Sequence, residues 1–304
     1  MITHIPVLAS EIIEALAIEP GKIYVDGTTG GAGHSRMILA AKPKHLYSFD
    51  QDKEVVDRVE AERRRINCNE ALPRRNESED RWSLIHSNFK NIWSYCKTNK
   101  IKINGGILLD LGLSSIQLDD PHRGFSFKYN SDLDMRMDQG LEFSAKDIVN
   151  QYNEKDLADI IFRYGEERKS RQIAAAIIKY RPFDTSEKLA ELIKIIYARG
   201  SNGKTFRIHP ATKTFQALRI EVNKELEVLE EFLELDFDVL QPGAVLAIIS
   251  FHSLEDRIVK NAFKKYVSED KLELLCKKPI IATEEEISQN PRSRSAKLRL
   301  ARVI

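Results

Sequence analysis

The sequence contains little cysteine, no excess of either charge and no long apolar run. Its cysteines, Cys68, Cys96 and Cys276, are odd in number and widely spaced, which excludes a disulfide framework or a zinc knuckle. Lys and Arg number 47 against 46 for Asp and Glu, so a basic coat over the whole surface is excluded. The longest apolar runs, such as 245–251, are too short to span a bilayer. The first residues also lack a signal-peptide pattern, so we expect a reduced, cytoplasmic protein.

One catalytic pattern and two kinds of binding site are missing as well. No Gly-x-x-x-x-Gly-Lys-Ser/Thr run occurs, which excludes a P-loop. No Gly-x-Ser-x-Gly elbow occurs, which argues against an α/β-hydrolase. The seven histidines show no ligand spacing with cysteine, so no metal site is predicted.

What is present is a soluble, globular composition, with 304 residues that are 42% apolar and 31% charged. Strand and helix patterns alternate in the first third, which predicts a parallel sheet with crossover helices. The predicted strands are 22–26, 45–50, 82–86 and 106–110, and the predicted helices are 35–41 and 52–65. The polar segment 67–81 lacks periodicity and is interpreted as a surface loop, most simply a tolerated insertion.

A helical block interrupts this alternation from residue 125 to residue 209. A capping-box pattern at Ser144–Asp147 and apolar residues at helical spacing within 157–196 predict its helices. Beyond the block, an apolar stripe over 215–233 predicts one long helix, and 245–251 predicts a strand buried on both faces. Segments 272–276 and 296–304 are the last predicted strands. The predicted domains are therefore a core at 1–125 and 213–304 with an inserted domain at 126–212.

The stretch Asp26–Ser35 is a glycine-rich loop between a strand and a helix, where a backbone can approach a ligand closely. A dinucleotide site needs Gly-x-Gly-x-x-Gly, and the third glycine is missing after Gly33. S-adenosylmethionine needs a looser glycine loop and an acid at the second strand end for its ribose, and Asp50 stands there. A plain tight turn with Asp50 as a helix cap is the alternative. The paired features favour a nucleotide-type ligand, and S-adenosylmethionine modestly over NAD.

Asp110 ends the fourth strand, at the edge where α/β sheets bind ligands. A carboxylate there can accept a hydrogen bond from an exocyclic amine. That bond would return electron density to a nitrogen whose lone pair is delocalised into an aromatic ring. The alternative is that Asp110 only caps the following turn. Phe89, after the third strand, can lie against an adenine ring or belong to the core, and the core is the simpler interpretation.

Polar and titratable residues crowd the segment Ser250–Arg257, directly after the buried strand. Ser250, His252 and Asp256 suggest a hydrolase triad, but triad members are usually dispersed along a chain. Substrate binding fits better, with Phe251 stacking on a base while polar side chains grip its edge. A helix N-cap with acids in its first turn is the plain alternative.

Basic and aromatic residues occur together in Arg123–Lys128, and basic residues recur in the C-terminal run Arg292–Arg302 and at Arg207, Lys213 and Arg219. Such mixtures suit single-stranded RNA, through phosphate contacts and base stacking. Each patch alone is more simply a solvated face. Together they favour a nucleic-acid substrate weakly.

Taken together, these motifs resemble the MraW family of ribosomal RNA small-subunit methyltransferases. The resemblance extends from Pro6 nearly to the C-terminus, and its specificity lies in the joint order of its motifs. These motifs are Asp26–Ser35, Asp50, Ile107–Ser115, Gln117–Asp120, Arg123–Phe127, Leu133–Asp138, Tyr164–Arg168, His209–Arg219, Ser250–Arg257 and Asn290–Arg294. Two features depart from expectation. The loop at 67–81 is long for the family, and Asp110-Leu-Gly-Leu replaces the Asp/Asn-Pro-Pro-Tyr motif of other amino-methyltransferases.

The resemblance implies a Rossmann-like α/β methyltransferase core that binds S-adenosylmethionine, with the helical insertion as a substrate-recognition domain. It implies methylation of the exocyclic N4 amine of a cytidine in the decoding centre of 16S rRNA, within the small ribosomal subunit and with no membrane partner. The sequence does not decide whether the protein forms a homodimer. Asp110 is then the first choice for orienting the amine, with His252 or Asp256 holding the base edge or relaying the proton. The implied cofactor contacts are Ala32, Gly33, His34, Asp50, Phe89, Asp110 and Gln117.

Two other functions fit fewer of these residues. A ribosome-assembly factor that used a methyltransferase fold only to bind RNA would not need the glycine loop and Asp50. An NAD-linked oxidoreductase would need the missing third glycine. The sequence leaves open both the target nucleotide and whether the substrate is free RNA or an assembled subunit.

Overall fold

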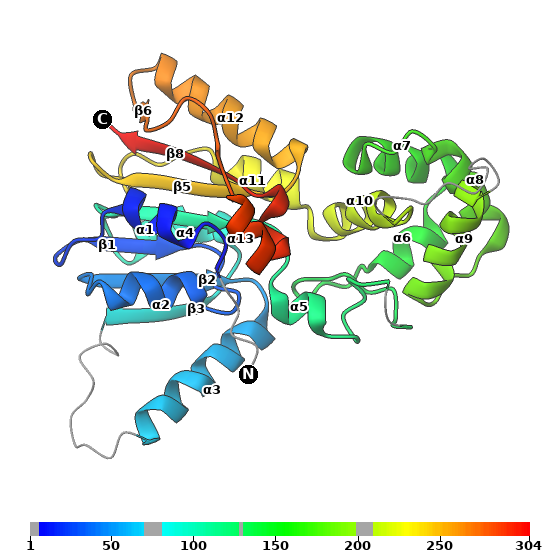
Figure 1. Ribbon diagram of the computed structural model, residues 1–304, viewed down its shortest axis with the longest axis horizontal. Coiled ribbons are helices and arrows are strands. Elements are labelled where there is room, and N and C mark those ends of the chain that lie inside the picture. The colour runs from blue at the N-terminus through cyan, green and yellow to red at the C-terminus, as the bar shows by residue number, and fades with distance from the viewer. Residues whose placement is uncertain (1–5, 70–80, 128–129, 199–208) are drawn as a thin grey trace. The chain divides into compact units, whose positions relative to one another are not determined.

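A mixed sheet with five parallel strands at one side organises the computed structural model, which describes residues 6–69, 81–127, 130–198 and 209–304. The strand order is β3-β2-β1-β4-β5-β8-β6, and β7 pairs with β8 (Figure 1). Strand β8 is antiparallel to its neighbours β5, β6 and β7. The strands are β1 (Ile23–Asp26), β2 (His45–Asp50), β3 (Trp82–His86), β4 (Gly106–Asp110), β5 (Val245–Ser250), β6 (Leu272–Leu274), β7 (Ile280–Ile281) and β8 (Lys297–Val303).

The predicted α/β class with a parallel sheet is confirmed. Strands β2, β3 and β4 have the predicted bounds, and β5 is buried at every position, as its continuous apolar run predicts. The last strands are shorter than predicted, because β6 ends at Leu274 and β8 covers Lys297–Val303. Their antiparallel pairing comes from the long-range return of β8 beside β5, which no local pattern encodes.

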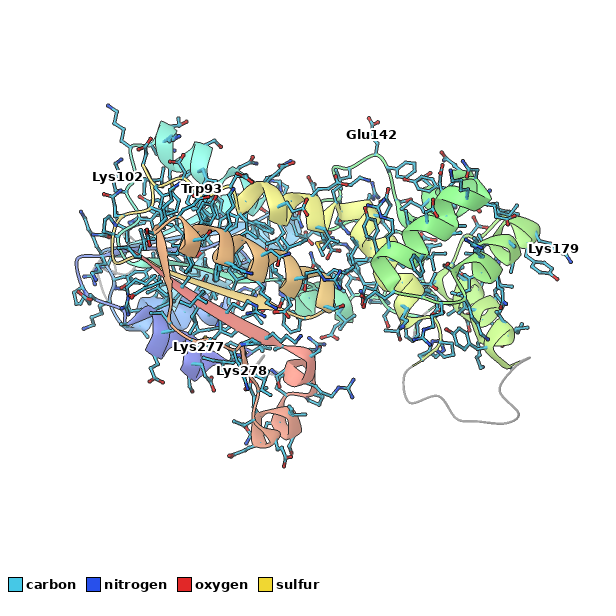
Figure 2. All side chains as sticks on the ribbon, turned by 90° about the horizontal axis from the view of Figure 1, so that it is seen from above. Trp93, Lys102, Glu142, Lys179, Lys277 and Lys278 are labelled. Carbon is cyan, nitrogen blue, oxygen red and sulfur yellow. The ribbon has the colours of Figure 1, made fainter. Side chains whose placement is uncertain are left out.

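The chain divides into two compact units, of which the first contains residues up to Ser114 together with Leu226–Ile304 and carries the sheet. Each face of its sheet has its own apolar cluster, one including Phe232 and Phe263 and the other including Ile12 and Ile38. Trp93, labelled in Figure 2, stacks on Phe232 with ring centroids 5.1 Å apart. Its helices are α1 (Ala9–Leu16), α2 (Gly33–Ala40), α3 (Lys53–Asn69), η2 (Phe89–Asn91), α4 (Ile92–Thr98), α11 (Glu225–Phe232, in this unit from Leu226), α12 (Ser253–Ser268), α13 (Glu284–Gln289) and η3 (Pro291–Ser295).

Helix α3 corrects part of the predicted loop at 67–81. The helix continues to Asn69, so residues 67–69 are helical. Neither glycine nor proline occurs between the predicted helix end and Pro73, so nothing in the sequence forces the helix to stop earlier. Residues 70–80 of the predicted loop lie outside the described residues.

The second unit, Ser115–Glu225, contains the predicted insertion at 126–212 and extends beyond it at both ends. Helices at the predicted places dominate it, and the predicted capping box is present, with the Ser144 N–H donating to Asp147 Oδ2 at 2.9 Å. In both units, the described helices include none long and apolar enough to cross a membrane. The helices of this unit, green to yellow-green in Figure 1, are α5 (Ser115–Asp119), α6 (Ala145–Gln151), α7 (Glu154–Gly165), α8 (Ser170–Tyr180), α9 (Ser186–Ala198) and α10 (Thr212–Asn223).

The prediction of one long helix over 215–233 is wrong. Helix α10 ends at Asn223, and Lys224 takes a left-handed conformation with φ of 50° before α11 begins. Asn223 is engaged elsewhere: its side chain accepts from the Met137 N–H at 2.7 Å and donates to the Met135 carbonyl at 2.8 Å. The apolar stripe therefore continues in the sequence, but the helix is interrupted at the boundary between the two units.

Candidate active site at the carboxyl edge of the sheet

Five parallel strands end at one edge of the sheet, and a polar residue ends each of them. These residues are Asp26, Asp50, His86, Asp110 and Ser250. Loops at the carboxyl ends of parallel strands are where open α/β sheets bind ligands. The sequence-predicted residues of the first unit gather around this edge.

Asp26 is buried beneath the glycine-rich loop and belongs to a hydrogen-bond network. Its Oδ2 accepts from Ser35 Oγ at 2.6 Å, and Ser35 Oγ lies 2.9 Å from Ser48 Oγ. The indole of Trp82 donates to Ser48 at 2.8 Å, so the network joins α2 to three strands. Burial raises the pKa of Asp26, opposed by the bond from Ser35. This aspartate therefore fixes the start of α2 from beneath the loop.

The glycines of the loop have different tasks. A Cβ at Gly27 would lie 2.3 Å from the side chain of Leu109, so Gly27 is needed for packing. Gly30 has φ of +47°, which glycine adopts without strain. A Cβ at Gly31 would meet no described atom within 4 Å, so there is open space beside the backbone of this residue. The loop from Gly27 to Gly31, called the cradle below, therefore has an accessible backbone at Gly31.

Helix α2 begins directly after this cradle. Ala32, fully buried with φ of 59°, is its N-cap and makes no side-chain cap hydrogen bond. No acidic residue follows in the first turn, which comprises Gly33, His34 and Ser35. The early N–H groups of a helix carry partial positive charge and need acceptors. This end suits a carboxylate, such as the one on the methionine part of S-adenosylmethionine.

Asp50 closes the other side of the cradle. Its Oδ2 accepts from the Gly30 N–H at 2.8 Å, and its Oδ1 accepts from the Asp52 N–H at 2.9 Å. A carboxylate has about four acceptor directions, so about two remain for other donors. Burial raises the pKa of Asp50 to about 6, although both backbone bonds oppose the shift. An ionised Asp50 would gain from two further donors, which is what a ribose diol supplies.

Asp110 ends β4 beside the same cradle. Its backbone N–H donates to Thr28 Oγ1 at 2.6 Å, which ties it to the loop. Its Oδ1 is buried without a hydrogen-bond partner among the described residues. Its Oδ2 lies 3.4 Å from Nε2 of His34, whose side chain is only 7% exposed. An acceptor oxygen buried in this way costs about 1–3 kcal/mol unless a donor reaches it.

The two other predicted cofactor contacts lie at different places. Phe89 begins η2, is partly buried, and packs edge-on against Phe232 with centroids 5.8 Å apart. This contact supports the core interpretation and leaves a ligand contact as a prediction. Gln117 lies in α5, within the second unit.

The segment after β5 shows the helix N-cap that sequence analysis weighed as an alternative. His252 caps α12, with Nδ1 accepting from the Glu255 N–H at 3.4 Å. Glu255 completes a capping box by accepting from the His252 N–H at 3.3 Å, and the same oxygen also accepts from the Phe251 N–H at 2.8 Å. An imidazole that accepts at Nδ1 carries its proton on Nε2. This Nε2 lies 3.2 Å from Glu255 Oε1 and has no well-aligned hydrogen bond among the described residues.

Glu255 has a role that was not predicted from the sequence. Its buried carboxylate holds the turn that carries His252. The signal was available as an acid three residues after a polar N-cap.

Asp256 is held by the neighbouring strand β8. Its carboxylate pairs with Arg299 Nε at 2.7 Å and with Lys297 Nζ at 3.1 Å. Burial would raise the pKa of Asp256, but these two cations outweigh it and lower the pKa. The geometry favours a role in anchoring α12 over the predicted role in proton transfer.

The same ion pairs weaken the interpretation of the basic C-terminal run as an RNA-binding surface. Lys297 and Arg299 face Asp256, and Arg302 pairs with Glu273 at 3.0 Å. In the second unit, Arg219 is paired bidentately with Glu225 at 2.8 and 2.9 Å. These cations are therefore compensated within the protein.

The comparisons with known proteins decide the family. The model of the MraW methylase family matches residues 1–304. The chain belongs to this family. It is 47% identical over 306 residues to the ribosomal RNA small subunit methyltransferase H of Trichormus variabilis, covering 98% of this chain and 91% of that protein. The protein of the same name from Nostoc punctiforme is 48% identical (98% and 93% covered), and that from Deinococcus deserti is 47% identical (98% and 92% covered).

Membership confirms the predicted resemblance and, with it, a methyltransferase that uses S-adenosylmethionine. The residues of the cradle fit this cofactor, because they offer a positive helix end, an accessible glycine backbone and a carboxylate with open acceptor directions. Which residues contact it stays a prediction.

Proposed function

We propose that the protein methylates the exocyclic N4 amine of a cytidine in the decoding centre of 16S rRNA, within the small ribosomal subunit. The observation that carries the proposal is the buried, unpartnered Oδ1 of Asp110 at the carboxyl edge of β4. The amine of cytosine is a hydrogen-bond donor, and Oδ1 of Asp110 is an acceptor without a donor among the described residues. The names of the relatives support a small-subunit rRNA substrate.

Three groups of the first unit would hold the cofactor: the start of α2 at Gly33 and His34, the backbone near Gly31, and the carboxylate of Asp50. S-adenosylmethionine supplies an electrophilic methyl group when it is bound. The positive end of α2 would face the carboxylate of the cofactor, and Asp50 would accept from the ribose hydroxyls. A site of this kind accelerates transfer mainly by holding the reactants in line.

Asp110 would orient the amine by accepting one of its N–H bonds. The neighbouring register pairs Asp110 with Ile249, so the segment Ser250–His252 emerges beside it. The Nε2–H of His252 can then donate to the edge of the same base, and Phe251 offers a ring for stacking. The cytidine must leave its stack to enter, which is the usual cost for enzymes acting on a base.

The test is a methyl-transfer assay on small ribosomal subunits that lack base methylation. Purified protein and isotopically labelled S-adenosylmethionine are incubated with the subunits, and the RNA is digested to nucleosides for mass spectrometry. We expect label in N4-methylcytidine. Label in another nucleoside would contradict the proposed target. Absence of label together with absence of cofactor binding in calorimetry would favour the assembly-factor alternative.

A further inference from the structure

The imidazole of His34 is buried, yet it makes no hydrogen bond to any residue that the structure describes. Neither ring nitrogen has a hydrogen-bond partner among the described residues, and the residue is only 6% exposed. A buried polar atom without a hydrogen bond is destabilising, and an apolar side chain at this position would avoid that cost. Packing alone therefore does not explain why a histidine stands here.

The groups that face the ring are two carboxylates from strand ends. Burial would lower the pKa of His34, but Asp110 on β4 and Asp26 on β1 outweigh it and raise the pKa above the ordinary value of 6.5. Asp26 already accepts from Ser35 Oγ at 2.6 Å and from the Thr28 N–H at 3.1 Å. Asp110 is the partner in ion-pair range, with Oδ2 at 3.4 Å from Nε2.

We propose that His34 is a positioning residue for Asp110: by pairing with Oδ2, it fixes the rotation of the carboxylate and leaves Oδ1 to accept the substrate amine. The proposal rests on the proposed function, because it assigns the use of Oδ1 to that amine. Asp110 is then held twice, by Thr28 through its backbone N–H and by His34 through its side chain.

The chemistry requires no proton transfer by His34. The amine nitrogen forms a bond to the methyl carbon while the sulfur–carbon bond breaks, with its electron pair going to sulfur. One amine proton then leaves to water. His34 holds the acceptor in place throughout.

The first experiment measures the pair in the unliganded protein, where activity plays no part. Side-chain nitrogen NMR follows the titration of His34 in the wild type and in Asp110→Asn. We expect the pKa of His34 to lie above 6.5 in the wild type and to fall in the variant, because the opposing charge is removed while burial persists. Equal pKa values in the two proteins would overturn the proposal. His45, whose Nε2 lies 2.9 Å from Ser83 Oγ at the other end of β2, is the internal control and should titrate unchanged.

The second experiment separates positioning from cofactor binding. His34→Leu removes the pairing group, and His34→Gln keeps an N–H donor without the charge. With saturating cofactor, we expect kcat to fall about tenfold or more in His34→Leu while the KM for RNA stays within about threefold, and we expect His34→Gln to recover part of the loss with a flatter pH profile. A loss of cofactor affinity in calorimetry with unchanged kcat would overturn the proposal in favour of a plain cofactor contact.

A matched control variant is His45→Gln, which should leave kcat and its pH profile unchanged. The proposed function and the pairing of His34 with Asp110 can be refuted independently of each other. Absence of cytidine methylation by the wild type would contradict the proposed function, whereas the NMR titration would still test the pair of His34 and Asp110.

Discussion

Asp50→Asn tests most directly whether Asp50 binds the ribose of the cofactor, because this substitution should weaken cofactor binding without unfolding the protein. The carboxylate already serves two backbone donors, Gly30 at 2.8 Å and Asp52 at 2.9 Å. An amide has one oxygen, so it cannot serve these N–H groups and two ribose hydroxyls together. At least one charge-assisted bond to the cofactor is lost.

The magnitudes follow from these contacts. A hydrogen bond to a charged group contributes about 1.5–3 kcal/mol, so affinity should fall about 10- to 150-fold. A pKa of about 6, against an ordinary 3.8, places about 3 kcal/mol against the ionised form of Asp50 at neutral pH. The amide removes this cost but leaves one backbone N–H facing an NH₂ group, which costs about 1–3 kcal/mol. The free energy of unfolding should therefore change by less than about 2 kcal/mol.

The pH dependence has a defined sign. Because the pKa of Asp50 is raised in the folded protein, its contribution to stability is fully present below about pH 4 and is lost as the pH rises through about 6. Cofactor binding needs the ionised form and has the opposite dependence. Affinity should fall as the pH drops through about 6, and binding near pH 6 should release protons.

Calorimetry with S-adenosylhomocysteine, in buffers of different ionisation enthalpy, measures both the affinity and the released protons. Asp57→Asn is the matched control, since Asp57 is exposed on α3 and pairs with Lys53. An affinity of Asp50→Asn equal to that of the wild type would refute the reasoning. So would a wild-type affinity that stays constant between pH 7.5 and pH 5.5.

Three further predictions concern stability, each checked by urea denaturation. Gly27→Ala should destabilise by about 1–3 kcal/mol, because the new Cβ would lie 2.3 Å from the Leu109 side chain; an unchanged midpoint would show that the site can relax. Asn223→Ala should cost about 1–3 kcal/mol for each buried backbone group it leaves unpaired, and a neutral result would contradict its role in ending α10. Asp256→Ala should cost about 1–3 kcal/mol above pH 4 by stripping Arg299 of its partner. Because the pKa of Asp256 is lowered, this difference should shrink as the pH falls below about 4, and a difference that persists in acid would count against the ion pair.

The sheet and the position of its site could be predicted from local patterns. Apolar strands alternated with helices, and acids stood at the strand ends, so Asp50 and Asp110 had to share one edge. The glycine loop identified which end of which helix faces that edge. These features depend on neighbours in sequence and on the geometry of parallel strands.

The rest depended on contacts between distant segments. The break at Lys224 was invisible because the apolar stripe continues through it, while Asn223 is drawn to the backbone of Met135 and Met137. The anchoring of Asp256 required β8 to return beside β5 in antiparallel order. The contact of His34 with Asp110 joins a helix start to a strand end, and its short distance could not be read from spacing.

The most direct test of the central claim is a single-turnover methyl transfer with wild type and Asp110→Asn, both saturated with labelled S-adenosylmethionine and offered unmethylated small subunits. We expect N4-methylcytidine from the wild type. We expect transfer about 100-fold slower or worse from the variant, even though both proteins are saturated with the cofactor. Asp57→Asn should match the wild type. Equal transfer rates for wild type and Asp110→Asn would contradict the claim that Asp110 orients the amine.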